Sequence, residues 1–246
     1  MKTAVVQNKV WQEEGYEDFI AELEKVFAVK KVNVIPFTEE IHPEVAEPDL
    51  VLGSTRLIDL ARKRGWHVFP DFQPVEFEIF NREYWLNGIG GPTKIKDFVS
   101  FRSGEGNPVF VKPFTPKLFT AGICGEDFLN EFQFTKTESE LAEEVIWVSQ
   151  LKNISGPEYR FFIINGKIIT GSSYKEKRRS EITPHGSTWK ALDKMIKSSR
   201  LASGITGVVD LVWSDGWKIV EMNNLNSAGV YNSNYKALAE ALAKNV

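Results

Sequence analysis

The feature that most constrains the fold of this chain is a pair of apolar runs near its C-terminal end, separated by Asp215-Gly216. A type I′ turn needs positive φ at both central residues, and Asp-Gly is one of the dipeptides that adopt it most readily. The sequence therefore predicts a β-hairpin over residues 207–223, in which Ser214 pairs with Trp217.

Two carboxylates and one amide are expected on one face of this hairpin. Counting outward from the turn places Asp210 directly opposite Glu221, with Asn223 two residues further along the same face. Opposed carboxylates repel each other, and a hard cation between them removes the repulsion. Carboxylate and amide oxygens form a ligand set that suits Mg²⁺, including Mg²⁺ held jointly with nucleotide phosphates. The sequence thus predicts a metal site here; the alternative is a solvent-facing pair of acids at a hairpin edge.

The first third of the chain alternates short apolar runs with amphipathic segments. Residues 16–28 carry apolar side chains at helical spacing, and Ser54 or Thr55 can cap a second helix that ends near Arg64. Strands are expected over residues 2–7, 32–37, 49–53 and 67–70. This alternation predicts a small parallel sheet covered by helices. The glycines do not form the GxGxxG pattern of a Rossmann dinucleotide site.

Bulk composition excludes several classes of protein. A net charge of −3 gives no electrostatic footprint for non-specific nucleic-acid binding. No apolar run approaches the ~20 residues of a membrane span, and no charged-then-apolar leader opens the chain. The single cysteine, Cys124, excludes an internal disulfide framework and indicates a reducing, cytoplasmic location.

A lysine ends an apolar run in the middle of the chain. Lys112 precedes a proline, which cannot continue a strand ladder. Beside Phe110 and Phe114 its charge costs desolvation free energy unless an anion meets it, and a phosphate oxygen is the obvious anion. The alternative is an edge lysine that extends its amine into solvent.

A second hairpin is predicted around Asn165-Gly166. This turn places Arg160 opposite Gly171, a position without a side chain. An open slot beside a planar guanidinium would suit a phosphate or a carboxylate. Pairing of Arg160 with Glu158 or Glu181 is the alternative.

Over about residues 75–235 these features occur in the order found in ATP-grasp ligases, and the chain resembles the branch with D-alanine–D-alanine ligase and glutathione synthetase. The motifs that carry the resemblance are Val111-Lys112-Pro113, Ser155-Gly-Pro-Glu158, Asp210 and Glu221-Met-Asn223 with the polar run 224–229. It implies an α/β fold, α+β in its C-terminal part, with Mg-ATP between two β-sheets. The implied domains are an N-terminal α/β pre-ATP-grasp domain, residues 1–75, and a nucleotide-binding catalytic domain, residues 76–246.

Further nucleotide contacts follow from the resemblance. In these ligases the metal-binding acids and Asn hold one or two Mg²⁺ ions that bridge the ATP phosphates. Lys112 is expected at the phosphates, with Lys117 and Thr120 in the loop that would close over them. The backbone of Trp147, Val148 and Ser149 is expected at the adenine edge. At the ribose, Glu158 and Gln150 are the alternative side chains.

The chain departs from the classical ligases at Val208, where they carry an arginine two residues before the metal-binding aspartate. Another cation must then neutralise the transferred phosphate, and the basic run of residues 174–179 supplies Lys175, Arg178 and Arg179. A solvated surface is the alternative for this run. The changed basic set is similar to that of a phage-enriched side branch of the superfamily, in which arginines and a lysine take over.

The activity implied by the resemblance is ADP-forming ligation of a carboxylate to an amine or another nucleophile through an acylphosphate. ATP and Mg²⁺ are the implied cofactors, and Lys112 and Arg160 would position the phosphate. The substrates would be small molecules, peptides or proteins, and ligases of this family are often dimers. Two alternatives stay open: a kinase acting on a small molecule or protein group, and a nucleotide-binding regulator without turnover.

Overall fold

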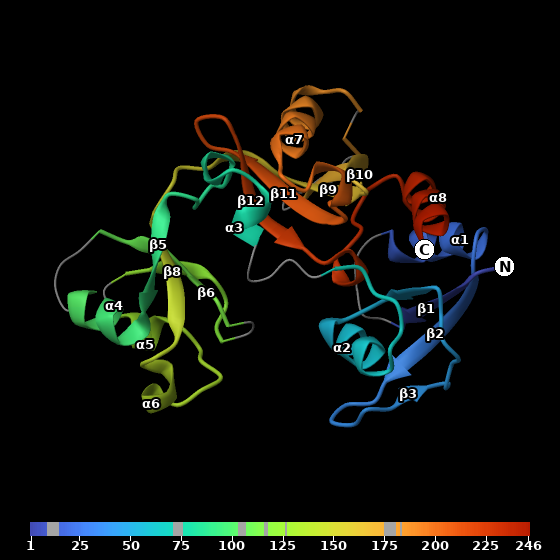
Figure 1. The fold of residues 1–246 in the computed structure, drawn as a ribbon, viewed down its shortest axis with the longest axis horizontal. Coiled ribbons are helices and arrows are strands. Elements are labelled where there is room, and N and C mark those ends of the chain that lie inside the picture. Colours follow the sequence, from blue (N-terminus) through green and yellow to red (C-terminus); the bar gives the residue numbers. More distant parts are fainter. Residues whose placement is uncertain are drawn as a thin grey trace.

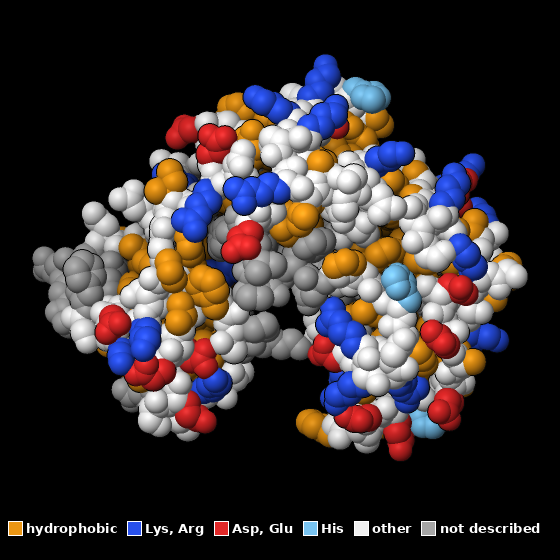
Figure 2. All heavy atoms as spheres, in the orientation of Figure 1, with side chains coloured by type: hydrophobic (Ala, Val, Ile, Leu, Met, Phe, Trp, Pro, Cys, Tyr) orange, Lys and Arg blue, Asp and Glu red, His pale blue; other side chains and the backbone are white. Residues whose placement is uncertain are grey.

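The protein forms three lobes around three four-stranded sheets (Figure 1). The computed structural model describes residues 1–8, 15–70, 76–102, 107–115, 118–125, 127–174, 181–182 and 184–246, and the three sheets are those of these residues. We name them in chain order the N-terminal, middle and C-terminal sheets. In space the C-terminal sheet lies between the other two, and Figure 2 shows the molecule hollowed between the two outer lobes.

The N-terminal sheet has the order β3-β2-β1-β4. Its strands are β1 (Thr3–Gln7), β2 (Ala28–Val34), β3 (Ile41–His42) and β4 (Leu50–Leu52), with helices α1 (Tyr16–Glu24) and α2 (Thr55–Lys63). β1 pairs in parallel with β2 and β4, which confirms the predicted small parallel sheet, and β3 adds an antiparallel edge. Ser54 caps α2 as predicted, because its side chain accepts a hydrogen bond from the backbone N–H of Leu57.

The strand predicted over residues 67–70 is wrong. This segment has no strand neighbour, because side-chain amides satisfy its backbone instead. The Phe69 N–H donates to Asn226 Oδ1 at 2.8 Å, and Asn224 Nδ2 donates to the carbonyls of Phe69 and Pro70, both at 3.0 Å. The chain after the candidate metal motif therefore holds this part of the N-terminal lobe in place.

The middle sheet is antiparallel, with the order β5-β8-β6-β7. Its elements are β5 (Gly90–Lys94), α4 (Ile95–Arg102), β6 (Val109–Pro113), β7 (Gly122–Cys124), α5 (Phe128–Glu131), α6 (Glu138–Leu141) and β8 (Val145–Gln150). Val111 and Ile146 pack against these helices in one apolar core. Since side chains alternate along a strand, Lys112 and Trp147 point to the opposite face.

The C-terminal sheet is also antiparallel, with the order β10-β9-β11-β12. Its strands are β9 (Ser155–Ile164), β10 (Lys167–Tyr174), β11 (Gly207–Trp213) and β12 (Trp217–Asn223); the remaining helices are α3 (Glu76–Ile79), α7 (Ser187–Ser198), α8 (Tyr235–Asn245) and the 3-10 turns Arg82–Tyr84, Ala202–Gly204 and Leu225–Ser227. α7 covers one face, over Phe161 and Val209. The other face carries Phe162 and Val208 and shares a core with the N-terminal lobe and α8.

The hairpin β11–β12 has the predicted pairing of Asp210 with Glu221, although the turn differs. Trp213, not Ser214, lies opposite Trp217. The predicted pairing of Ser214 is therefore wrong by one residue. A β-bulge at Val220 adds one residue to β12 and cancels this offset, so the two acids still face each other.

The hairpin β9–β10 turns at Asn165-Gly166 with positive φ at both residues, as predicted. The pairing of Arg160 with Gly171 is wrong, because a β-bulge at Ile169 shifts the register by one residue. Arg160 lies opposite Ser172. The slot that glycine would have left beside the guanidinium is absent.

The predicted domain division falls at residues 71–75, outside the described residues, and stays a prediction. Apolar side chains from both sides of it share one core, with Phe19 and Leu50 packed in the same cluster as Phe162, Val208 and Leu242. Among the described helices, none combines the length and the apolar character needed to cross a membrane.

Candidate active site

A row of four polar side chains crosses the C-terminal sheet, one on each strand. Ser172, Arg160, Asp210 and Glu221 are successive partners across β10, β9, β11 and β12, so they share one face. This polar row lies on the face that carries Phe162 and Val208. Asp210 is fully buried, whereas 41% of the Glu221 side chain is exposed. The row thus runs from the interior to an accessible end at β12.

Arg160 and Asp210 form a two-point ion pair within the row. Arg160 Nε donates to Asp210 Oδ1 at 2.8 Å, and Arg160 Nη2 donates to Oδ2 at 2.7 Å. Arg160 is therefore paired with Asp210, which neither sequence alternative had named. The ring of Tyr231 stacks on the guanidinium, 4.9 Å from Cζ, and the Gly229 carbonyl accepts a long bond from Nη1.

Glu221 and Asn223 lie side by side at the accessible end of the row. Asn223 Nδ2 donates to Glu221 Oε1 at 2.8 Å, which directs the amide oxygen of Asn223 away from the acid. Arg160 Nη2 is 3.8 Å from the same Glu221 oxygen. Two carboxylates and one amide group thus lie next to one another at this end of the row.

The two acids influence each other's protonation. Burial, together with the adjacent Glu221, raises the pKa of Asp210 to about 6, although Arg160 opposes the shift. Burial alone would raise the pKa of Glu221, but the hydrogen bond from Asn223, the contact with Asp210 and the charges of Arg160 and Lys112 bring it below its ordinary value. The two carboxylates repel each other when both are charged, and a cation bound between them would remove this repulsion.

The donor set fits a Mg²⁺ ion. It consists of oxygen atoms only, from Asp210, Glu221 and Asn223, which is the chemistry that Mg²⁺ prefers. No cluster of three or more His, Cys, Asp or Glu side chains occurs in the part of the chain that the structure describes. The amide oxygen of Asn223 is therefore needed to complete a third protein ligand.

Lys112 approaches this site from the middle sheet. Burial lowers its pKa to about 8, and the charge of Glu221 acts against that shift. The lysine and the carboxylate lie on different sheets, so their electrostatic interaction indicates that the two sheet faces meet here.

The residues expected at the nucleoside lie at the same junction. Trp147, Val148 and Ser149 pair with β5 on one side and β6 on the other, so their backbone groups belong to two ladders. The first backbone outside both ladders follows Gln150, and the contact of residues 147–149 with an adenine edge stays a prediction. Trp147 Nε1 donates to the Asn87 carbonyl at 2.8 Å.

Two of the other predicted residues lie in the described part of the chain and four lie outside it. Glu158 lies on β9 two residues before Arg160 and on the same face, and Thr120 is exposed just before β7. Lys117, Lys175, Arg178 and Arg179 lie outside the described residues. Sequence reasoning missed Ser172 and the contact of Tyr231 with Arg160. An aromatic residue shortly after the metal motif was a signal for the second.

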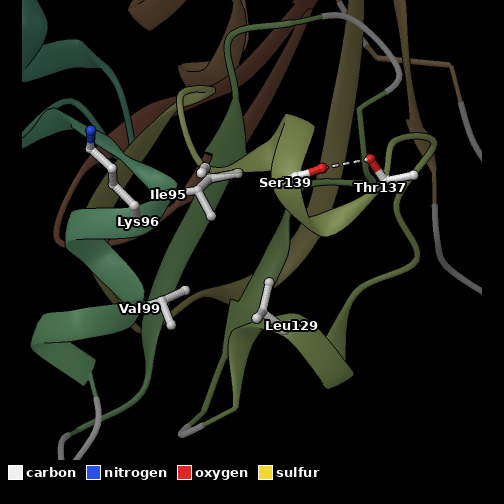
Figure 3. Close-up of a pocket in the computed structure, with 7 residues that line it drawn as sticks. Ile95, Lys96, Val99, Leu129, Thr137 and Ser139 are labelled. Atoms are coloured by element: carbon white, nitrogen blue, oxygen red, sulfur yellow. Dashed lines mark hydrogen bonds between the residues drawn. The ribbon is translucent and has the colours of Figure 1, made fainter.

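A pocket of about 740 Å³ lies elsewhere, between α4, α5 and α6 (Figure 3). Its lining includes Ile95, Val99 and Leu129, and none of its residues belongs to the polar row. This pocket lies on the helix-covered side of the middle sheet. The pocket and the polar row are therefore separate features of the molecule.

The family follows from a comparison with family models. Residues 92–241 match the model described as ATP-grasp domain, R2K clade family 2. The chain belongs to the ATP-grasp superfamily. This match confirms the predicted superfamily, and the predicted enzyme class, an ADP-forming ATP-grasp ligase, agrees with it. Association with phages stays a prediction.

Solved ATP-grasp structures share the fold. D-cycloserine synthetase DcsG is similar with a TM-score of 0.62 at 13% identity, over 98% of both chains. D-alanine–D-alanine ligase from Bacillus anthracis, complexed with ATP, has a TM-score of 0.53 at 14% identity, over 100% of this chain and 97% of that one. The ligase PsnB, with minimal precursor, Mg and ADP, has a TM-score of 0.52 at 12% identity, over 99% and 97%. A search of curated proteins finds no match. The predicted ATP-grasp fold is confirmed.

Proposed function

We propose that this ATP-grasp protein ligates a carboxylate to an amine or a related nucleophile through an acylphosphate. The observation that carries the proposal is the meeting of Lys112 on the middle sheet with the polar row on the C-terminal sheet. Cations from both sheets and the paired acids would meet the ATP phosphates if Mg-ATP binds between the two sheets, as the resemblance implies.

The reaction has two steps. A carboxylate oxygen of the first substrate attacks the γ-phosphorus, the bond to the bridging oxygen breaks, and ADP leaves. The nucleophile then attacks the carbonyl carbon of the acylphosphate, inorganic phosphate leaves, and the amine proton passes to solvent. An amine that arrives deprotonated requires no protein base.

The chain's own residues provide position and charge. Lys112 places an ammonium at the phosphates, and its burial keeps water from screening that charge. Arg160 is held rigidly by Asp210 and Tyr231, so its position does not depend on the nucleotide. Asp210, Glu221 and Asn223 would hold Mg²⁺, which when bound supplies positive charge to the phosphate oxygens.

Nucleotide contacts outside this centre belong to the same proposal. Gln150 and Glu158 are the candidates for the ribose, and the backbone of Trp147, Val148 and Ser149 for the adenine. Thr120 is a candidate at the phosphates. The further candidates lie outside the described residues: Lys117, Lys175, Arg178 and Arg179.

The names of two similar structures guide the choice of substrate class. The structure of one similar ligase is complexed with a precursor peptide and another similar protein is a D-cycloserine synthetase, so we propose a peptide or small-molecule carboxylate. We further propose action in the cytoplasm, where the buried thiol of Cys124 stays reduced. Assembly into a homodimer also belongs to the proposal.

A thermal-shift titration with ATP tests the nucleotide site. Specific binding to the native state raises the melting temperature by mass action. We expect a Mg²⁺-dependent rise in the wild type and in Glu143→Gln, a matched exposed control, but not in Glu221→Gln. A rise that survives in Glu221→Gln would contradict the metal assignment, and no rise in the wild type would contradict ATP binding.

Product analysis then distinguishes the reactions. A ligase releases ADP and phosphate together with a condensed product when a carboxylate and an amine are both present. A stable phosphoester would instead identify a kinase. ATP binding without ADP release across a panel of carboxylate–amine pairs would identify a regulator.

A further inference from the structure

We propose that the guanidinium of Arg160 permanently takes the place of a second metal ion, so that the site binds one divalent cation per nucleotide. The inference rests on the proposed function and specifies its metal requirement. It starts from the coordination of Asp210. Each carboxylate oxygen of Asp210 already accepts a hydrogen bond from a different nitrogen of Arg160, at 2.8 and 2.7 Å.

The guanidinium is fixed in this position from several sides. Arg160 is only 7% exposed, and the Tyr231 ring lies 4.9 Å from its Cζ. Tyr231 itself adopts a left-handed backbone conformation, with φ of 43°, which a residue other than glycine rarely adopts. The surrounding loop therefore enforces the stacking of the ring on the guanidinium.

The serine on the neighbouring strand β10 does not hydrogen-bond to Arg160. Ser172 lies directly opposite Arg160 and is fully buried, yet its hydroxyl has no hydrogen-bond partner among the described residues. A guanidinium turned toward β10 would have met this hydroxyl. Its two strong bonds instead go to Asp210, on β11.

The two acids therefore differ in how easily a cation can reach them. Asp210 has no exposed surface and one whole edge occupied by Arg160, whereas Glu221 is 41% exposed and has Asn223 beside it. A cation can enter at the Glu221 and Asn223 end and still contact Asp210 from there. A second cation on Asp210 would have to lie beside a guanidinium that cannot lose its proton.

The ratio of metal to nucleotide retained by the protein tests the inference. The wild-type protein is equilibrated with excess Mn²⁺ and a non-hydrolysable ATP analogue, and the protein-bound fraction is analysed for both. We expect one Mn²⁺ per retained nucleotide and the electron paramagnetic resonance spectrum of isolated Mn²⁺. Two Mn²⁺ with spin–spin coupling would overturn the inference and leave the proposed function intact. No retained nucleotide would overturn both.

A variant tests the cause of the single site. Arg160→Gln removes the guanidinium, and we expect the ratio to rise from one toward two because the inner edge of Asp210 becomes available. Arg200→Gln makes the same change at an exposed position and should keep a ratio of one. A ratio of one in folded Arg160→Gln would overturn the role of the guanidinium. If that variant does not fold, the wild-type ratio and spectrum still decide.

Discussion

The ion pair buried in the C-terminal sheet contrasts with the exposed ion pairs at the middle sheet. In the C-terminal sheet Arg160 and Asp210 are buried and joined by two hydrogen bonds. In the middle sheet Lys94 and Lys96 both pair with Glu143, whose side chain is 62% exposed. Each partner of the buried pair needs the other to neutralise its charge, whereas water screens the charges of the exposed pairs. Burial, rather than the number of ion pairs, decides which charges the fold depends on.

Removing Arg160 should have the largest effect on stability. Arg160→Met leaves the buried Asp210 carboxylate without its cation, and breaking such a pair costs about 3–5 kcal/mol. Urea unfolding should show this loss in the free energy of unfolding. The double variant Arg160→Met with Asp210→Leu should recover most of it. A loss below about 1 kcal/mol in the single variant would mean that this pair contributes no more to stability than an exposed ion pair does.

Replacing Lys112, the buried cation of the middle sheet, should weaken ATP binding and stabilise the protein without nucleotide. Lys112→Met removes a charged contact with phosphate, so ATP affinity should fall about 10- to 100-fold. The melting temperature without nucleotide should rise, because burial disfavours the charged amine. Isothermal titration calorimetry and a thermal scan measure the two effects. A lower melting temperature would show that the amine stabilises the empty protein.

The same lysine predicts a pH dependence. Its pKa is about 8 in the folded protein against an ordinary value of 10.5, so between these values the unfolded state binds more protons. Stability therefore rises with pH across this window. The melting temperature of the wild type, compared with that of Lys112→Met at each pH, should increase from about 8 to 10.5. A flat difference would contradict the burial of the charge.

A smaller effect is expected at the inner end of the polar row. Ser172 buries a hydroxyl that has no hydrogen-bond partner among the described residues. Ser172→Ala removes this cost, so stability should stay unchanged or increase by up to about 1 kcal/mol. Chemical denaturation measures the change. A loss of that size would instead reveal a hydrogen-bonded water beneath the row.

The smallest effect is expected at the exposed pairs. Lys94 and Lys96 hold the pKa of Glu143 at about 2, yet 62% of this side chain is exposed to solvent. Glu143→Gln should leave the denaturation midpoint unchanged within error at low and at physiological salt. A salt-dependent loss comparable to that of Arg160→Met would remove the distinction between the two sheets.

The two hairpins show how far the sequence determines such a site. Both turns were readable, because Asp215-Gly216 and Asn165-Gly166 adopt the positive φ that these dipeptides favour. Each hairpin also contains a β-bulge that no local signal announced. At β11–β12 the bulge cancelled a one-residue error in the turn, and Asp210 still met Glu221. At β9–β10 nothing compensated, and the predicted partner of Arg160 was wrong.

The central ion pair was beyond sequence reasoning for a different reason. Arg160 and Asp210 are fifty residues apart on strands that are neighbours only through the sheet order. The order of strands depends on packing of the whole sheet between α7 and the N-terminal lobe. Residue type and spacing identified both side chains as important. They could not show that the two neutralise each other.

The packing of α8 against α1 has a consequence for how the protein is made. Phe19 and Leu23 of α1 share a core with Leu238 and Leu242 of α8, more than two hundred residues later in the chain. During synthesis the N-terminal strands and α1 leave the ribosome first, with an apolar surface that α8 will later cover. The first lobe to emerge is therefore among the last to be completed, and it presents a surface that chaperones can bind throughout translation of the remaining chain.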